Sequence, residues 1–265
     1  MGEKNCRAEC AALLQSLIIG CSLVAADTAL AGTDGASAID SPLQAQTRFR
    51  SSVDVAVAAE SPSQHVLGVT QADWTVRWWR WWMSIPQGVG PTNDTDGTQC
   101  GINQEGPVWF IGGPIGDNLS YERSCTVPAG KWILLPVINY LNDYPCVSDP
   151  GFQPGERQTL EAFLAEGATS VIDGVTTYDA ILDKRAAPVR RIRTGLFGFT
   201  AAADLNRFDT CLTGSPQLGV ADGYFVFLEP LRPGKHTLSI HSKISGPDRE
   251  TTGTYNLNIS GPIPK

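Results

Sequence analysis

The sequence lacks the short motifs that mark familiar enzymes. It contains no G-x-S-x-G nucleophile elbow, no H-E-x-x-H zinc motif, no phosphate-binding P-loop and no glycine-rich dinucleotide fingerprint. These absences argue against the well-known serine hydrolases, zinc proteases and nucleotide-dependent enzymes. They leave open a binding protein or an enzyme of a less familiar kind.

The chain also lacks an excess of positive charge. Its formal net charge is −7, which argues against nonspecific nucleic-acid binding, because phosphate backbones attract basic proteins. Basic residues cluster only once, at Lys184-Arg185 and Arg190-Arg191-x-Arg193. We interpret this cluster as the solvated edge of a strand and loop, with contact to an anionic polymer as the alternative.

Long hydrophobic runs are missing, so the sequence predicts no transmembrane segment. The apolar stretch at residues 11–26 is too short to span a bilayer. Lys4 and Arg7 precede it, and the small-x-small sequence Ala29-Leu30-Ala31 follows it. This order is typical of an export signal and predicts a signal peptide at residues 1–31.

The expected mature chain begins at Gly32 and is secreted, either extracellular or periplasmic. The alternative is a lipoprotein anchored through Cys21, because the preceding residues resemble a bacterial lipobox. Residues 32–63 lack hydrophobic periodicity and predict a poorly ordered segment. Residues 64–265 then form one predicted domain.

No cysteines have the Cys-x-x-Cys spacing of common zinc sites. Outside the predicted signal peptide the cysteines are Cys100, Cys125, Cys146 and Cys211. An even number in an exported chain predicts two disulfides. We favour Cys100–Cys125 and Cys146–Cys211, because the first pair flanks the apolar run at residues 108–111. The other two connectivities and a zinc site are the alternatives.

Tryptophan, by contrast, is abundant in one place. Five of the seven tryptophans lie between Thr70, a helix-capping residue, and Pro86, a stop signal. On a helix their side chains cover most of the circumference, and only Arg77, Arg80 and Ser84 share a polar stripe. We call this segment the Trp helix and expect it to be buried nearly all round.

Beyond the Trp helix, short apolar runs alternate with Gly- and Pro-rich turns. They predict strands at residues 108–111, 131–139, 170–172, 175–178, 224–229, 235–244 and 254–260. Asp173-Gly174 predicts a hairpin turn, and residues 156–166 predict a second, short helix. This pattern favours a mainly β fold, an antiparallel β-sandwich of jelly-roll type with one buried Trp-rich helix.

Several motifs occur in a fixed order. They are Asp94-x-x-Gly97-x-x-Cys100, Gln104-x-Gly106-Pro107-Val108-Trp109-Phe110-x-Gly112-Gly113, Cys125-x-Val127-Pro128-x-Gly130-Lys131, Pro136-Val137-Ile138-Asn139, Asp222-Gly223-Tyr224 and Pro230-Leu231-x-Pro233-Gly234-Lys235-His236-Thr237. Together they resemble a family of exported microbial proteins of uncharacterised function, over roughly residues 74–260. The resemblance implies a secreted, mainly β protein and supplies no catalytic residues.

Four residues are candidate ligand contacts. Arg77 and Arg80 suit bidentate recognition of an acidic ligand such as a uronate. A structural role is the preferred reading for this pair, through stacking on neighbouring indoles and pairing with a carboxylate such as Asp222 or Glu229. Trp109 and Trp132 are candidate platforms for sugar rings, although core packing is again the preferred reading.

Acidic residues suggest two further kinds of site. Asp94 and Asp96 lie in an oxygen-rich turn that departs from the EF-hand pattern, so a looser calcium site competes with a simple Asx-turn. No other cofactor is predicted. Paired carboxylates for glycoside chemistry have four candidates: Glu105, Glu122, Asp143 and Glu229.

The sequence therefore favours an extracellular binding protein for carbohydrate or another cell-surface polymer. The first alternative is a secreted carbohydrate-active enzyme, a hydrolase or lyase, that uses carboxylates together with Arg77 and Arg80. The second alternative is a structural protein of the envelope. The sequence does not predict an oligomeric state.

Overall fold

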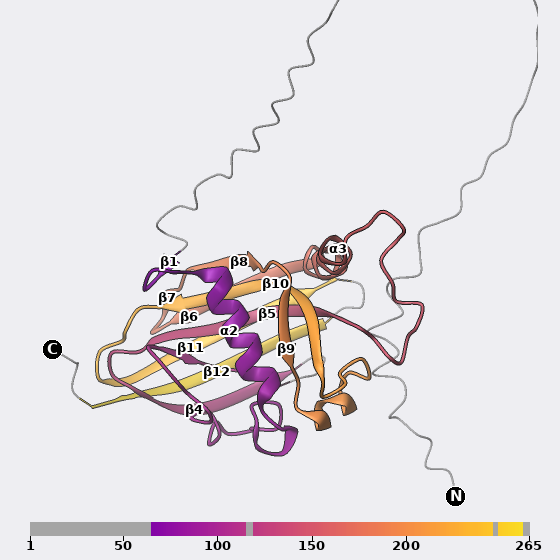
Figure 1. The fold of residues 1–265 in the computed structure, drawn as a ribbon. Helices are drawn as coiled ribbons and strands as arrows, with labels where there is room; N and C mark the ends of the chain where they lie inside the picture. The colour runs from indigo at the N-terminus through magenta and orange to yellow at the C-terminus, as the bar shows by residue number, and fades with distance from the viewer. Residues whose placement is uncertain (1–64, 115–118, 246–248, 262–265) are drawn as a thin grey trace, which may run out of the picture.

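The structure is a computed structural model that describes residues 65–114, 119–245 and 249–261. The predicted signal peptide, the lipid-modified Cys21 of the alternative and the segment at residues 32–63 lie outside the described residues. The described residues form two α-helices, two short 3₁₀ segments and twelve strands. Most of the strands belong to two five-stranded sheets (Figure 1).

The first sheet has the order β3-β5-β10-β8, with β9 also paired to β10. Its strands are β3 (Val108–Phe110), β5 (Trp132–Tyr144), β8 (Val189–Arg193), β9 (Phe197–Thr200) and β10 (Pro216–Leu228). The second sheet has the order β4-β12-β11-β6-β7. Its strands are β4 (Ser120–Pro128), β6 (Val175–Leu182), β7 (Arg185–Ala186), β11 (Gly234–Ile244) and β12 (Arg249–Ser260).

The two sheets confirm the prediction of a mainly β sandwich. They are mixed sheets, because β3 runs parallel to β5 and β4 runs parallel to β12, while all other pairs are antiparallel. The jelly-roll connectivity is not confirmed. A two-stranded ribbon of β1 (His65–Val66) and β2 (Val69–Thr70) precedes the first helix.

The hydrophobic residues form two cores, one on each side of the first sheet. The sheet–sheet core lies between the two sheets and is largely aliphatic, with Ile133, Leu135, Val226, Leu238, Ile240 and Leu257 among its members. The helix-side core lies between the first sheet and the helix that crosses it, with Trp74, Trp78, Trp81, Leu134, Phe225 and Phe227 among its members. Strands β5 and β10 supply both cores, so apolar residues are buried on both of their faces.

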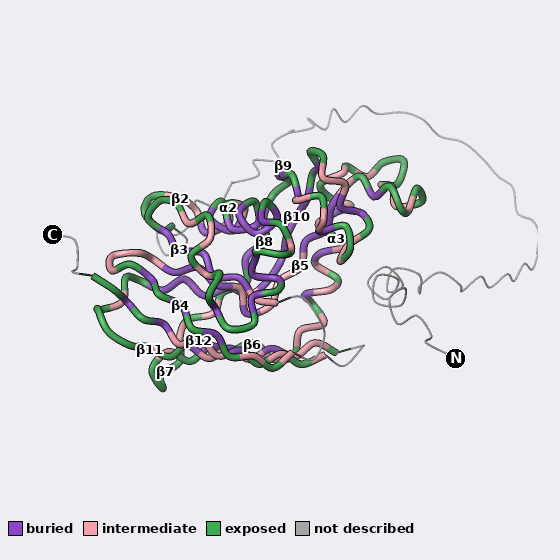
Figure 2. The backbone as a smooth tube through the Cα atoms, turned by 90° about the horizontal axis from the view of Figure 1, so that it is seen from below, coloured by how far each residue is buried: buried purple, intermediate pink, exposed green. Residues whose placement is uncertain are grey.

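The Trp helix is α2 (Gln71–Ser84), which crosses the outer face of the first sheet (Figure 1). The second sheet covers the opposite face (Figure 2). Thr70 caps the helix by accepting a hydrogen bond from the Asp73 amide at 3.0 Å. All five tryptophans of α2 are buried, as predicted. The exposed positions are Asp73, Arg77, Arg80 and Ser84, which recur every three or four residues and therefore form one stripe.

Three indole N–H groups of α2 are bonded to backbone carbonyls. Trp74 Nε1 donates to Val66 at 2.8 Å, Trp78 Nε1 donates to Ile111 at 2.9 Å, and Trp81 Nε1 donates to Ile102 at 3.0 Å. Buried indoles require such partners. These bonds attach the helix to three separate segments of chain.

The second helix corrects the sequence prediction. Helix α3 is Leu160–Ile172, so the predicted helix at residues 156–166 is too early and the predicted strand at residues 170–172 is wrong. Leu164, Ala168 and Ile172 are buried at a spacing of four residues, and α3 packs on β5 and β10. Burial of this face outweighs the strand preference of the final β-branched residues. Asp173 is consequently the C-terminal cap of the helix, not part of a hairpin turn.

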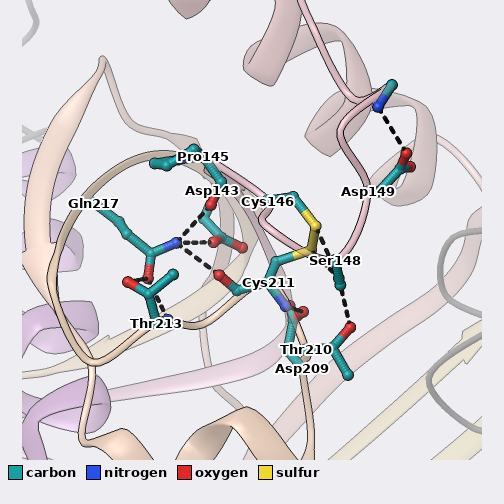
Figure 3. The surroundings of a disulfide bond; sticks show 11 residues. Asp143, Pro145, Cys146, Ser148, Asp149, Asp209, Thr210, Cys211, Thr213 and Gln217 are labelled. Carbon is teal, nitrogen blue, oxygen red and sulfur yellow. Dashed lines mark hydrogen bonds between the residues drawn. A yellow bond between two sulfur atoms is a disulfide. The ribbon is translucent and has the colours of Figure 1, made fainter.

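Both predicted disulfides are present. Cys100 bonds Cys125 with a Cα–Cα distance of 5.8 Å, and Cys146 bonds Cys211 with a Cα–Cα distance of 4.2 Å. The first disulfide fastens the loop before β3 to β4. The second joins the loop after β5 to the loop before β10 (Figure 3). Disulfides of this kind are compatible with a protein that resides outside the cytoplasm.

Candidate ligand-binding surface

Arg77 and Arg80 lie on the exposed stripe of α2, about one helical turn apart. The guanidinium of Arg77 lies 4.4 Å from the ring centre of Trp74, so the predicted stacking on an indole is present. Arg80 Nε donates to the carbonyl oxygen of Gly198 in β9 at 2.8 Å. Each arginine therefore has one contact that fixes its orientation and leaves other donors available.

The predicted carboxylate partners of these arginines are wrong. Asp222 is fully buried and bonds Arg191 and Arg193 of β8 instead, and Glu229 is exposed. Among residues 65–114, 119–245 and 249–261, neither Arg77 nor Arg80 forms an ion pair with a carboxylate. Within the described part of the chain, the two guanidinium groups on α2 are thus without a counter-charge.

A shallow hollow of about 590 Å³ opens beside Arg80. Its lining comes from the second half of α2 and the paired strands β9 and β10: Arg80, Ser84, Gly198, Phe199, Thr200, Pro216, Gln217 and Leu218. Gly198 pairs with Leu218, and Thr200 pairs with Pro216. The side chains of Leu218, Thr200 and Pro216 therefore point to one face of the ribbon, because residues two apart share a face. The hollow therefore combines an apolar floor with hydroxyl groups and a cation.

The two candidate tryptophan platforms contribute little exposed ring. Trp109 retains 9% of its accessible surface and belongs to the sheet–sheet core. Its ring therefore offers no open face for a sugar, which corrects the platform reading. Trp132 is half-buried and packs against the helix-side core. The two rings lie on opposite faces of the first sheet, because Trp109 pairs with Ile133 and Trp132 pairs with Val108.

The predicted calcium loop is held by its own backbone. Asp94 is buried, and its carboxylate accepts hydrogen bonds from the amides of Gly97 at 2.9 Å and Gln99 at 3.2 Å. Asp96 accepts from the amide and the hydroxyl of Thr98. Gly97 has a φ of +93° and lies against the backbone of Ser124, where a Cβ would collide. This geometry matches the Asx-turn reading, and the calcium reading gains no support from it.

The part of the chain that the structure describes contains no group of three or more His, Cys, Asp or Glu side chains placed to hold a metal ion. Among the helices of the described residues, none is long and apolar enough to cross a membrane. Lys184, Arg185 and Arg190 of the basic cluster are exposed, as predicted, whereas its other two members, Arg191 and Arg193, pair with the buried Asp222.

Of the four candidate carboxylates, three are exposed: Glu105, Glu122 and Glu229. Asp143 differs, because it is buried at the end of β5, where Gln217 Nε2 donates to its Oδ2 at 2.9 Å. Burial and the nearby charge of Asp209 raise the pKa of Asp143 to about 7. Burial also raises the pKa of Asp209.

Asp209 and Gln217 were missed by sequence reasoning. Gln217 Nε2 also donates to the carbonyl oxygens of Pro145 and Cys211, and its Oε1 accepts from Thr213 (Figure 3). The predicted Cys146–Cys211 bond was the available signal, because Asp143 and Asp209 lie three and two residues before its cysteines. Asp143 does not line the hollow beside Arg80. It pairs with Gly219, so its side chain lies on the other face of β10 from Leu218.

Comparisons with protein-family models, with curated proteins and with solved structures give no match to this chain. The resemblance to an exported microbial family therefore remains a prediction from the sequence motifs.

Proposed function

We propose that this protein is exported and binds an acidic polysaccharide through Arg77, Arg80 and the hollow beside them. The observation that supports this proposal is the absence of a carboxylate partner for either arginine among the described residues. A guanidinium that receives a ligand carboxylate is unpaired until the ligand arrives.

The surroundings of Arg80 favour a ligand that is both acidic and extended. Its Nε is fixed to Gly198, which presents the terminal nitrogens in one orientation and lowers the entropy lost on binding. Ser84 and Thr200 offer hydroxyl groups to sugar hydroxyls, while Leu218 and Pro216 offer apolar surface to sugar C–H groups. An open hollow without enclosing walls suits one stretch of a polymer better than a small molecule.

The helix that carries both arginines is rigid, because its other faces are packed. Five buried tryptophans and three indole hydrogen bonds hold α2 on the first sheet. A ligand contact on α2 is therefore preorganised by the core beneath it.

A carbohydrate-active enzyme is the second candidate. The observation that favours it is the acid pair of buried Asp143 and half-buried Asp209, both with a raised pKa, since carboxyl pairs serve as proton donors in glycoside chemistry. Neither residue of the pair lines the hollow beside Arg80, so binding is the better-supported function. No observation specifically favours a structural envelope role.

The test is a calorimetric titration of the parent and of Arg77→Met/Arg80→Met with a galacturonate hexasaccharide, at low and high salt. We expect the double variant to fold normally and to lose about tenfold or more in affinity, the equivalent of one charge-assisted contact. The parent affinity should fall as salt rises, because exposed charges are screened.

Arg157→Met is the matched control. Arg157 is also exposed and forms no ion pair with a described residue, so its loss removes the same charge at a site away from α2. Equal affinities for the parent and the double variant would refute the proposal. So would an equal loss in Arg157→Met, which would indicate net charge as the only cause.

A further inference from the structure

Tyr178 in β6 is an exposed aromatic side chain that stacks on a second tyrosine. It retains 43% of its accessible surface. Its ring stacks on Tyr224 of β10 with a centroid distance of 3.8 Å and an interplanar angle of 16°. The two tyrosines come from different sheets, so this contact bridges the edge of the sandwich.

A buried carboxylate, Asp222, holds the arginine that lies against the Tyr224 ring. The guanidinium of Arg191 lies 6.0 Å from the centre of the Tyr224 ring. Two nitrogens of Arg191 donate to the two oxygens of Asp222, at 3.0 and 2.8 Å, and a third contacts Asp173 at 2.7 Å. Asp222 has no exposed surface. All three guanidinium nitrogens of Arg191 therefore contact carboxylates of the protein itself.

Arg193 has donors to spare. Its Nε donates to Asp222 at 3.2 Å, its side chain is 49% exposed, and its terminal nitrogens have no acceptor within the described ranges. Arg193 shares Asp222 with Arg191, so it belongs to the same rigid cluster as the stacked tyrosines. The cluster therefore exposes the aromatic ring of Tyr178 and the terminal guanidinium nitrogens of Arg193.

We propose that Tyr178 and Arg193 form a second polysaccharide subsite, in which Tyr178 stacks on a pyranose ring and Arg193 donates to oxygens of the same chain. An aromatic face carries partial negative charge and attracts the C–H groups of a sugar ring. The free guanidinium nitrogens match hydroxyl or carboxylate oxygens. The subsite rests on the proposed function and deepens it, because Tyr178 adds a contact that does not depend on ligand charge.

The subsite gives a role to the ion pairs of Asp222 with Arg191 and Arg193, which lie beside the tyrosine stack. Desolvating Asp222 is costly unless its partners are well placed. In return, the network places the Arg191 guanidinium against the ring of Tyr224, on which Tyr178 stacks. A ring held in this way loses little conformational freedom when a sugar binds.

The experiment titrates the full chain with two probes, a neutral β-1,4-glucan hexasaccharide and the galacturonate hexasaccharide. Tyr178→Ala should weaken both by roughly five- to tenfold, the worth of one aromatic contact. Tyr178→Phe keeps the stacked ring and should restore the affinity. Arg193→Met should weaken the galacturonate more than the neutral probe.

Ile181→Ala is the matched control. Ile181 lies in the same strand, also retains 43% of its surface, and lies on the opposite face of the sheet. The Ile181→Ala variant should bind both probes with the affinity of the parent. Thermal melts of each variant exclude unfolding as the cause.

The outcomes separate the two proposals. Unchanged affinity in Tyr178→Ala for both probes overturns the second subsite, even if Arg77→Met/Arg80→Met loses galacturonate. Unchanged galacturonate affinity in Arg77→Met/Arg80→Met, with a loss of neutral-probe affinity in Tyr178→Ala, overturns the Arg77/Arg80 surface alone. A parent that binds neither probe overturns both. A concentration-dependent dimer that Tyr178→Ala abolishes would instead assign this face to a second copy of the chain.

Discussion

The two faces of the first sheet are packed in different ways. The sheet–sheet core is built mainly from aliphatic side chains that alternate along facing strands, so the period-2 pattern of each strand determines which residues enter it. The helix-side core is built around indoles, and its contacts include directional hydrogen bonds from Trp74, Trp78 and Trp81. The sheet–sheet core also contains hydrogen-bonded side chains, such as the Tyr121–Tyr255 hydroxyl pair at 3.0 Å. The two cores therefore differ in their main side-chain type and in the indole hydrogen bonds of the helix side.

The largest effect should come from Trp78, at the centre of the helix-side core. Trp78 contacts Trp79, Trp82 and Phe225. We expect Trp78→Ala to lower the free energy of unfolding by about 3–5 kcal/mol through lost burial and an unfilled cavity. Denaturant unfolding measures this, with Leu257→Ala as the comparison in the sheet–sheet core. A loss below about 1 kcal/mol for Trp78→Ala would contradict the layered packing described above.

The second effect is the dependence of stability on pH at the helix side of the sheet. The folded pKa of Asp143, about 7, lies above its unfolded value of 3.8, so the folded state binds the proton more tightly. Stability from this group is complete below pH 4 and is lost as the pH rises to 7, with an upper limit on the order of 4 kcal/mol.

The variant Asp143→Asn should remove this dependence. Its stability should match that of the parent near pH 4 and exceed it above pH 7. Chemical denaturation at several pH values provides the comparison, and subtraction of the two curves removes the contribution of other titrating groups. Parallel curves for the two proteins between pH 4 and 8 would mean that Asp143 is ionised in the fold at no cost.

The smallest effect concerns the indole hydrogen bonds. Trp78 and Trp79 lie in the same core, but Trp79 Nε1 has no hydrogen-bond acceptor among the described residues. Trp78→Phe leaves the Ile111 carbonyl without its donor, whereas Trp79→Phe removes only ring volume. We expect Trp78→Phe to be the more destabilising by about 1 kcal/mol. Equal losses of stability would show that the indole bonds add nothing to the packing.

Strong local patterns explain why much of the fold was predictable. The Trp helix has a capping threonine, a continuous apolar arc and a terminating proline, and each signal acts within a few residues. The C-terminal strands show clean alternation. The even number of cysteines predicted two disulfides, and the apolar run between Cys100 and Cys125 favoured the pairing that the structure confirms. The prediction for the end of α3 was wrong because Ser170-Val171-Ile172 has a local preference for a strand. The burial of this segment against β5 and β10, which makes it helical, is a tertiary effect.

The candidate site was predictable only in part. Arg77 and Arg80 were identifiable because they interrupt an apolar helix. Only the structure could show that no described carboxylate pairs with them. The floor of the hollow comes from β9 and β10, more than a hundred residues further along the chain. Asp209 and Gln217 follow no local pattern, and Tyr178 looks like any strand residue until Tyr224 is placed beside it. Such groupings depend on strand order, which the sequence does not state.

The placement of β5 and β10 between two cores has a consequence for how the molecule opens. Their shared ladder has no solvated face over most of its length, so water reaches those amides only when one core is lost. Because each core uses side chains from the same two strands, separation of α2 or of the second sheet strips one side of the ladder. Amide hydrogens of β5 and β10 should therefore exchange with solvent last, through openings as large as global unfolding.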